Sequence, residues 1–97
     1  TVVLVNTGRG PVADETALIA ALQSGAIASA GLDVTETEPI PPDSPLLQMD
    51  NVFLTPHLAG ITQESLVRMS LHAAQGILAV LQGNKPDHVF NPEIYST

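Results

Sequence analysis

The feature that most constrains the fold is a set of three short apolar runs, each of which is followed by a charged or titratable residue. The runs lead to Arg9, Asp33 and His57, which are spaced 24 residues apart along the chain. Short β-branched and aliphatic runs are typical of strands in a parallel sheet, whose strands end at one edge. In an open α/β sheet this edge is where ligands bind. The sequence therefore predicts a site built from three strand ends.

The pattern predicts strands over 2–5, 27–34 and 52–54. Every side chain of the first run is apolar, so we expect that strand to be buried on both of its faces. The third strand stops at Pro56, which has no N–H to donate to a neighbouring strand. The segment 35–50 carries four prolines and no periodicity, which is typical of a long, functional loop.

Two helices complete the pattern. The first follows Asp14, a good N-cap, and stops at Ser24-Gly25. The second follows Thr62 over 63–82 and is apolar around most of its circumference, so we expect it to be buried on more than one side. Strands alternating with helices predict an α/β fold with a parallel sheet and right-handed crossovers.

Composition excludes several classes of function. The formal net charge is −7, and the only fixed cations are Arg9, Arg68 and Lys85, so neither nucleic acid nor an anionic membrane surface is an expected partner. No apolar run reaches the roughly 18 residues of a membrane span. The chain has no cysteine and three scattered histidines, so we expect no metal site. We expect a soluble, cytoplasmic protein, of which this chain is the carboxyl-terminal part.

Two residues stand out as candidates for catalysis. Arg9 lies between glycines, and its planar guanidinium suits a carboxylate; the alternative is a loop arginine that caps a backbone carbonyl. His57 follows a strand end, where a carboxylate on one ring nitrogen would leave the other to give or take a proton. Glu38 and Glu36 are both candidates for that carboxylate.

Asp33 and the residues after His57 are candidates for binding. Asp33 ends a strand, where it either caps a loop or accepts hydrogen bonds from a ligand. The small residues Ala59 and Gly60 would let a ligand approach the backbone closely. On residue types alone, a glycosidase-like carboxylate pair of Asp33 and Glu38 also stays open.

Three motifs together resemble the D-isomer-specific 2-hydroxyacid dehydrogenases. They are Val5-Asn6-Thr7-Gly8-Arg9-Gly10, Gly31-Leu32-Asp33-Val34 followed by Glu38-Pro39, and Thr55-Pro56-His57-Leu58-Ala59-Gly60. The resemblance implies the second half of a Rossmann-like parallel sheet, with a βαβ unit, a further strand and a long C-terminal helix. It implies that 1–83 belong to an NAD(P)-binding domain and that 84–97 form an extended C-terminal tail.

The resemblance also implies an enzyme that transfers a hydride between NAD(P)H and a 2-keto acid. Arg9 would hold the substrate carboxylate, His57 would donate a proton to the keto oxygen, and Glu38 would pair with His57. Asp33 would bind the nicotinamide carboxamide. The remaining cofactor contacts would come from Thr7, Gly8, Arg9 and the backbone of His57, Ala59 and Gly60.

Some properties stay open at this point. The family's G-x-G-x-x-G loop is absent from this sequence, so we expect the isolated chain to bind NAD(H) weakly or not at all and to have no turnover. The particular 2-hydroxy acid and the choice between NAD and NADP are not predicted. A homodimer is implied for the full-length protein. The alternative function is a non-catalytic, corepressor-like protein that senses NAD on the same fold.

Overall fold

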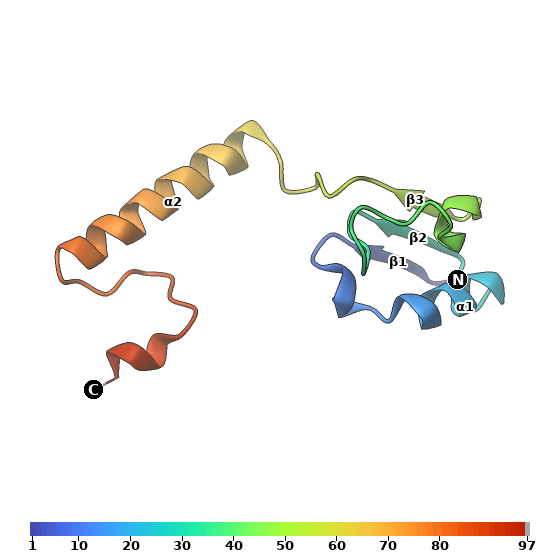
Figure 1. The fold of residues 1–97 in the computed structure, drawn as a ribbon, viewed down its shortest axis with the longest axis horizontal. Helices are drawn as coiled ribbons and strands as arrows, with labels where there is room; N and C mark the ends of the chain where they lie inside the picture. The colour runs from blue at the N-terminus through green and yellow to red at the C-terminus, as the bar shows by residue number, and fades with distance from the viewer. Residues whose placement is uncertain (97) are drawn as a thin grey trace. The chain divides into compact units, whose positions relative to one another are not determined.

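A computed structural model describes residues 1–96. The chain divides into two compact units, Thr1–Gly60 and Ile61–Thr97. The elements are in chain order β1 (Val3–Asn6), η1 (Gly10–Val12), α1 (Glu15–Gln23), β2 (Ser29–Leu32), η2 (Pro45–Gln48), β3 (Val52–Leu54), α2 (Gln63–Leu81) and η3 (Pro92–Tyr95). Figure 1 labels the strands and the α-helices. The predicted division at residue 83 concerns the complete domain and stays a prediction.

The first unit is built on a three-stranded parallel sheet in the order β1-β2-β3. Leu4 lies opposite Ala30, and Ala30 lies opposite Val52, so the three strands run in step and end together. The parallel sheet is confirmed. The second strand is shorter than the predicted 27–34, because only Ser29–Leu32 pair with β1 and only residues 30–32 pair with β3.

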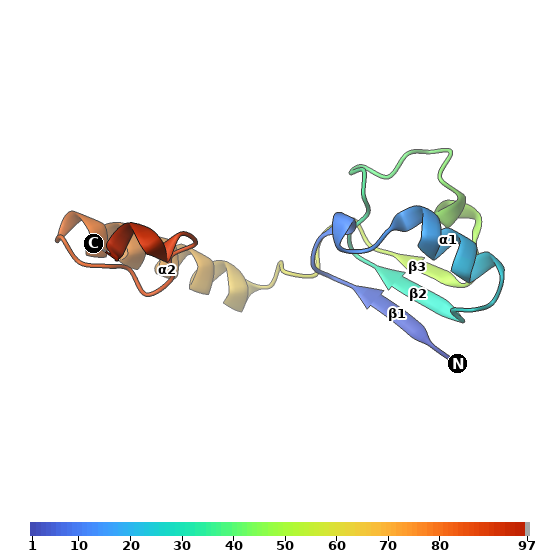
Figure 2. The same cartoon turned by 90° about the horizontal axis from the view of Figure 1, so that it is seen from below.

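One face of this sheet carries the core. The Asp14 side chain caps α1 by accepting the Ala17 N–H at 3.0 Å, as predicted. Figure 2 shows α1 and η2 on the same side of the sheet. The buried apolar side chains of this layer are Leu18, Leu22, Ala30, Leu32 and Leu46. Each leucine contributes about 2 kcal/mol by leaving water.

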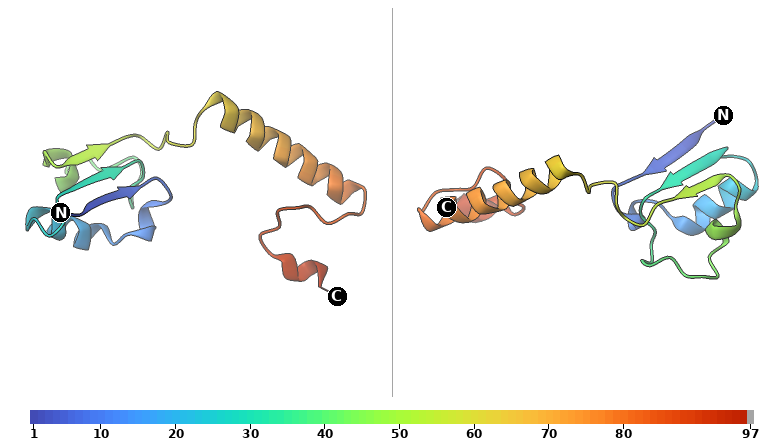
Figure 3. Two further views of the ribbon diagram at one scale, coloured as in Figure 1. Left: turned by 180° about the vertical axis from the view of Figure 1, so that it is seen from behind. Right: turned by 90° about the horizontal axis from the view of Figure 1, so that it is seen from above.

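The opposite face of the sheet carries no other element of this unit (Figure 3). Val3, Val5 and Phe53 are 59%, 69% and 72% exposed. The prediction that the first strand is buried on both faces is therefore wrong for the described chain. Alternate side chains point to opposite faces, and α1 and η2 cover only one of them.

The second unit consists of α2 and the segment that follows it. Thr62 caps α2 through a reciprocal capping box with Ser65, and Gly83 has φ +77°, as expected of a helix-ending glycine. The rings of His72 and His88 lie 5.7 Å apart, so the segment after Gly83 returns along the helix. The segment also forms η3 before the chain ends.

The expected burial of α2 is not present, since none of its residues is buried. Within the second unit, as far as residue 96, the segment that follows the helix does not bury these apolar stripes. None of the helices in that range has the length and apolar character needed to cross a membrane.

Candidate active site

His57 and Glu38 form the central pair of the site. His57 Nδ1 lies 2.7 Å from Glu38 Oε2, and the two side chains are 45% and 38% exposed. A carboxylate can only accept a hydrogen bond, so Nδ1 carries the hydrogen and donates it. The other carboxylate oxygen of Glu38 accepts the Thr35 N–H at 3.3 Å. The carboxylate is thus fixed from two sides, and it fixes the tautomer of the ring.

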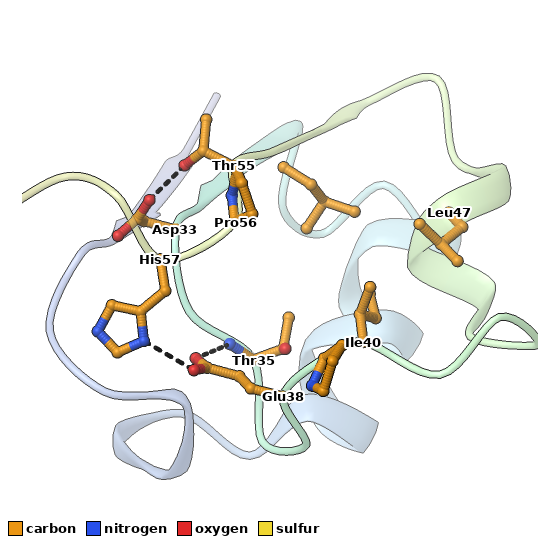
Figure 4. A pocket seen from close by; sticks show the side chains of 10 residues that line it. Asp33, Thr35, Glu38, Ile40, Leu47, Thr55, Pro56 and His57 are labelled. Carbon is orange, nitrogen blue, oxygen red and sulfur yellow. Dashed lines mark hydrogen bonds and ion pairs between the residues drawn. The ribbon is translucent and has the colours of Figure 1, made fainter.

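The second ring nitrogen of His57 is left to exchange a proton. Figure 4 shows it pointing away from Glu38 and away from a neighbouring cavity of about 530 Å³. The apolar lining of this cavity comes from Pro39, Ile40, Leu47, Leu54 and Pro56. A group that takes a proton from His57 Nε2 therefore lies outside this cavity.

Neighbouring groups shift the pKa of Glu38. The hydrogen bond with His57 holds the pKa of Glu38 below its ordinary value of 4.5, against a smaller opposing effect of burial. The Thr35 N–H and the charges of His57 and Arg9 act in the same direction as the hydrogen bond. The charge of Arg9 is the smallest of these effects.

This lowered pKa gives a pH-dependent stability. A carboxyl whose pKa falls on folding stabilises the protein above its unfolded pKa, and this stabilisation is lost as the pH drops through the folded value. We expect Glu38→Gln to have a lower Tm than the wild type above pH 4.5, and the two Tm values to converge below it. Thermal unfolding across this range measures the effect. Asp43→Asn removes an exposed carboxylate from the same loop and serves as the control. The difference between its Tm and that of the wild type should not show this dependence on pH.

Asp33 organises the backbone on which His57 stands. The residue is 5% exposed, and its carboxylate accepts the Thr55 hydroxyl at 2.5 Å, the Leu58 N–H at 2.8 Å and the Ala59 N–H at 3.0 Å. The Thr55 hydroxyl is the largest cause of the low pKa of Asp33. His57 itself has φ +56°, a left-handed conformation that costs a side-chain-bearing residue about 1 kcal/mol. The bonds to Asp33 offset this strain.

The loop after β1 presents Thr7, Gly8 and Arg9, all exposed. Asn6 shapes it, because its side chain accepts the Gly8 N–H at 3.1 Å and donates to the Arg9 carbonyl at 3.0 Å. Arg9 Nη1 donates to the Gly8 carbonyl at 2.8 Å. The simpler of the two interpretations of Arg9, an arginine that caps a backbone carbonyl, is thus present. Among residues 1–96 no acceptor is found for the other four guanidinium N–H groups.

Two contacts tie this loop and α1 to the loop that carries Glu38. Gly10 is buried, and a Cβ at its position would lie 2.0 Å from the Thr35 carbonyl oxygen. Glu36 Oε1 accepts the Glu15 N–H at 3.0 Å, while Glu15 Oε2 accepts the Glu36 N–H at 2.9 Å. Glu36, the second candidate for pairing with His57, therefore caps α1 instead.

The strand ends leave an open edge that suits one end of a dinucleotide. A Cβ added at Gly60 would meet nothing within 4 Å, and one added at Gly8 would meet only Asn6 Oδ1 at 3.6 Å. A flat ring and a sugar fit such an edge, with backbone groups close at hand. The chain has no glycine-rich loop of the kind that binds a pyrophosphate.

Comparison with known proteins decides the family. Residues 1–59 match the family model described as "D-isomer specific 2-hydroxyacid dehydrogenase, NAD binding domain". The chain belongs to this family. The resemblance drawn from the three motifs is therefore confirmed.

Individual dehydrogenases of this kind are closely similar to the chain. It is 50% identical over 92 residues to glyoxylate/hydroxypyruvate reductase B of Escherichia fergusonii, covering 95% of this chain. It is 50% identical over 94 residues to a glyoxylate reductase of Thermofilum pendens, covering 97% of this chain. In both cases it spans 28% of the relative's length.

Solved structures show the same fold. A D-isomer specific 2-hydroxyacid dehydrogenase from Xanthobacter autotrophicus Py2, in complex with NADPH and MES, is 44% identical with a TM-score of 0.82; the match covers 95% of this chain and 37% of that one. An NADPH-dependent glyoxylate/hydroxypyruvate reductase from Sinorhizobium meliloti, in complex with NADP and sulfate, is 34% identical with a TM-score of 0.77, over 92% and 28%. The Rossmann-like sheet predicted for the dehydrogenase family is confirmed.

The structure brings together most of the predicted site residues of this dehydrogenase chain. Glu38 and His57 are in contact, and Asp33, Ala59 and Gly60 lie at the same edge. Sequence reasoning missed Thr55, which binds Asp33, and Asn6, which shapes the Arg9 loop. An asparagine two residues before a glycine is a known turn signal and could have identified Asn6. No comparable local signal marks the Thr55 hydroxyl.

Proposed function

We propose that the chain forms the nicotinamide end of an NAD(P)-dependent D-2-hydroxyacid dehydrogenase that reduces a small 2-keto acid. The observation that carries this proposal is the 2.7 Å contact between His57 Nδ1 and Glu38 Oε2 at the carboxyl edge of the sheet. This contact leaves Nε2 facing the open side of the site. The relatives that are glyoxylate/hydroxypyruvate reductases favour glyoxylate or hydroxypyruvate as substrate.

The residues divide the work between anion binding and proton transfer. Arg9 binds the substrate carboxylate through its remaining N–H groups. His57 donates the proton to the keto oxygen from Nε2, while Glu38 holds the ring in place and stabilises the charge on it. The bound nicotinamide supplies the hydride that reduces the 2-carbon.

Cofactor binding follows the same edge. Thr7, Gly8 and the backbone at Ala59 and Gly60 line the nicotinamide end. Asp33 Oδ2 accepts one hydrogen bond from the described chain, so it retains capacity for a carboxamide N–H. A homodimer, carried over from the family resemblance, and a cytoplasmic location, expected from the composition, complete the proposal.

The direct test is coenzyme oxidation by the complete protein that carries this chain. We expect it to oxidise NADH or NADPH in the presence of glyoxylate or hydroxypyruvate, with a turnover of about 1–1,000 s⁻¹. Residues 1–97 alone should show no turnover, because the pyrophosphate contacts are missing. Absence of oxidation with every 2-keto acid would refute the activity, and turnover by the isolated chain would refute its dependence on the rest of the protein.

A further inference from the structure

Thr55 is placed where a side chain can control the loop that carries His57. It follows β3 directly, and its N–H donates to the Leu32 carbonyl at 3.0 Å, which continues the sheet pairing by one residue. Its hydroxyl donates to Asp33 Oδ1 at 2.5 Å, while Thr55 itself is exposed and lines the cavity beside His57. Figure 4 shows this bond on the opposite side of His57 from Glu38.

Asp33 in turn binds the backbone N–H groups of three consecutive residues, 57–59. Its backbone carbonyl accepts the His57 N–H at 2.8 Å, and its carboxylate oxygens accept the N–H groups of Leu58 and Ala59. These bonds define a short turn in which His57 has φ +56°. That backbone conformation sets the direction in which the His57 side chain leaves the chain, and Glu38 then holds the ring.

Removing the hydroxyl would weaken the whole arrangement. Asp33 is nearly fully buried, so a lost donor is not replaced freely by water. The carboxylate could then rotate, and its bonds to Leu58 and Ala59 would no longer be held in one geometry. The left-handed turn at His57 would lose part of the support that offsets its strain.

We propose that Thr55 is a positioning residue whose hydroxyl fixes the Asp33 carboxylate and thereby sets the direction of the His57 ring. The inference rests on the proposed role of His57 as proton donor. Thr55 does not touch the reacting atoms; it acts through Asp33 and the turn 57–59.

The test compares variants of Thr55 in the complete protein. Thr55→Val keeps the β-branched shape and removes the hydroxyl, whereas Thr55→Ser keeps the hydroxyl. We expect Thr55→Val to lower kcat by about tenfold or more while KM for the keto acid changes by about twofold or less, because Arg9 is on a separate loop. Thr55→Ser should recover most of kcat. Thr16→Val, an exposed threonine on α1, is the matched control.

A second readout does not depend on activity. Hydrogen exchange of the peptide that covers 56–62 should be about tenfold faster in Thr55→Val than in Thr55→Ser, because the Leu58 and Ala59 amides lose a fixed acceptor. If Thr55→Val fails to fold, Thr55→Ala removes the same hydroxyl with less demand on packing and takes its place.

The pH profile gives a third readout. The charged groups around the network are His57, Glu38 on the loop after β2, and Arg9 on the loop after β1. Loss of the Thr55 donor raises the pKa of Asp33, so the acid limb of kcat/KM should move to higher pH in Thr55→Val and stay in place in Thr55→Ser.

The outcomes separate the two proposals. Faster exchange with unchanged kcat and pH profile would show that Thr55 is merely structural and would overturn the inference, as would unchanged exchange. If His57→Ala kept full turnover, the proposed function would fail instead, and the exchange data would still report on the turn.

Discussion

Replacing His57 by alanine is expected to lower the proposed turnover of the complete protein by about a hundredfold to ten-thousandfold, the range expected when a positioned proton donor is removed. Nδ1 of the ring binds Glu38, and Nε2 can transfer a proton. Alanine has no group that could do so. Steady-state kinetics with glyoxylate and hydroxypyruvate measure the change. We expect the loss in kcat rather than in KM, because Arg9 still binds the carboxylate.

The other two histidines provide matched controls. His72 and His88 lie in the second unit, where their rings contact one another. Alanine at either position should leave kcat within about twofold of the wild type. The same variant of His57 separates an enzyme from a corepressor-like NAD sensor, since a sensor would keep its coenzyme-dependent partner binding and show no turnover to lose. A fully active His57→Ala protein would contradict the assigned role.

Gly10→Ala is expected to destabilise the first unit by about 3 kcal/mol or more, as for other substitutions that overfill a packed site. The new Cβ would stand 2.0 Å from the carbonyl oxygen of Thr35 and 2.6 Å from the nitrogen of Glu36, both backbone atoms that cannot swing aside. The two loops would have to separate, moving Arg9 away from Glu38. Thermal or denaturant unfolding measures the loss.

Gly8→Ala is the control for this substitution. Its Cβ would meet only the Asn6 side chain at 3.6 Å, an ordinary contact. Its Tm should therefore stay close to that of the wild type. Equal Tm values for the two glycine variants would show that the Gly10 contact with Thr35 does not constrain the loops.

The sequence predicted the parts of the fold that depend on local patterns. The third strand, the Asp14 cap and the Thr62 cap lie where the apolar runs and capping residues indicate. The edge that joins Arg9, Asp33 and His57 follows from the parallel order of three strands. These features depend on neighbours a few residues away, which a sequence displays directly.

The parts that the sequence could not predict depend on contacts between distant segments. Whether Glu36 or Glu38 pairs with His57 is decided by α1, whose N-terminus takes Glu36. The inward orientation of Asp33 depends on donors 22 to 26 residues away. The first strand and α2 are less buried than the sequence predicted. An apolar pattern indicates that a face can pack against another element, but it does not show which element packs there.

Formation of the site depends on the same contacts that form the sheet. β3 has three residues, and the contacts that complete the site span 19 residues to Glu38 and 22 to Asp33. The pairing of β2 with β3 spans 22 residues and that of β1 with β2 spans 26, so the loops closed by the site are no longer than those closed by the sheet. We therefore expect His57 and Glu38 to come together in the same step as the sheet, and on warming we expect the pair and the sheet to be lost in one transition.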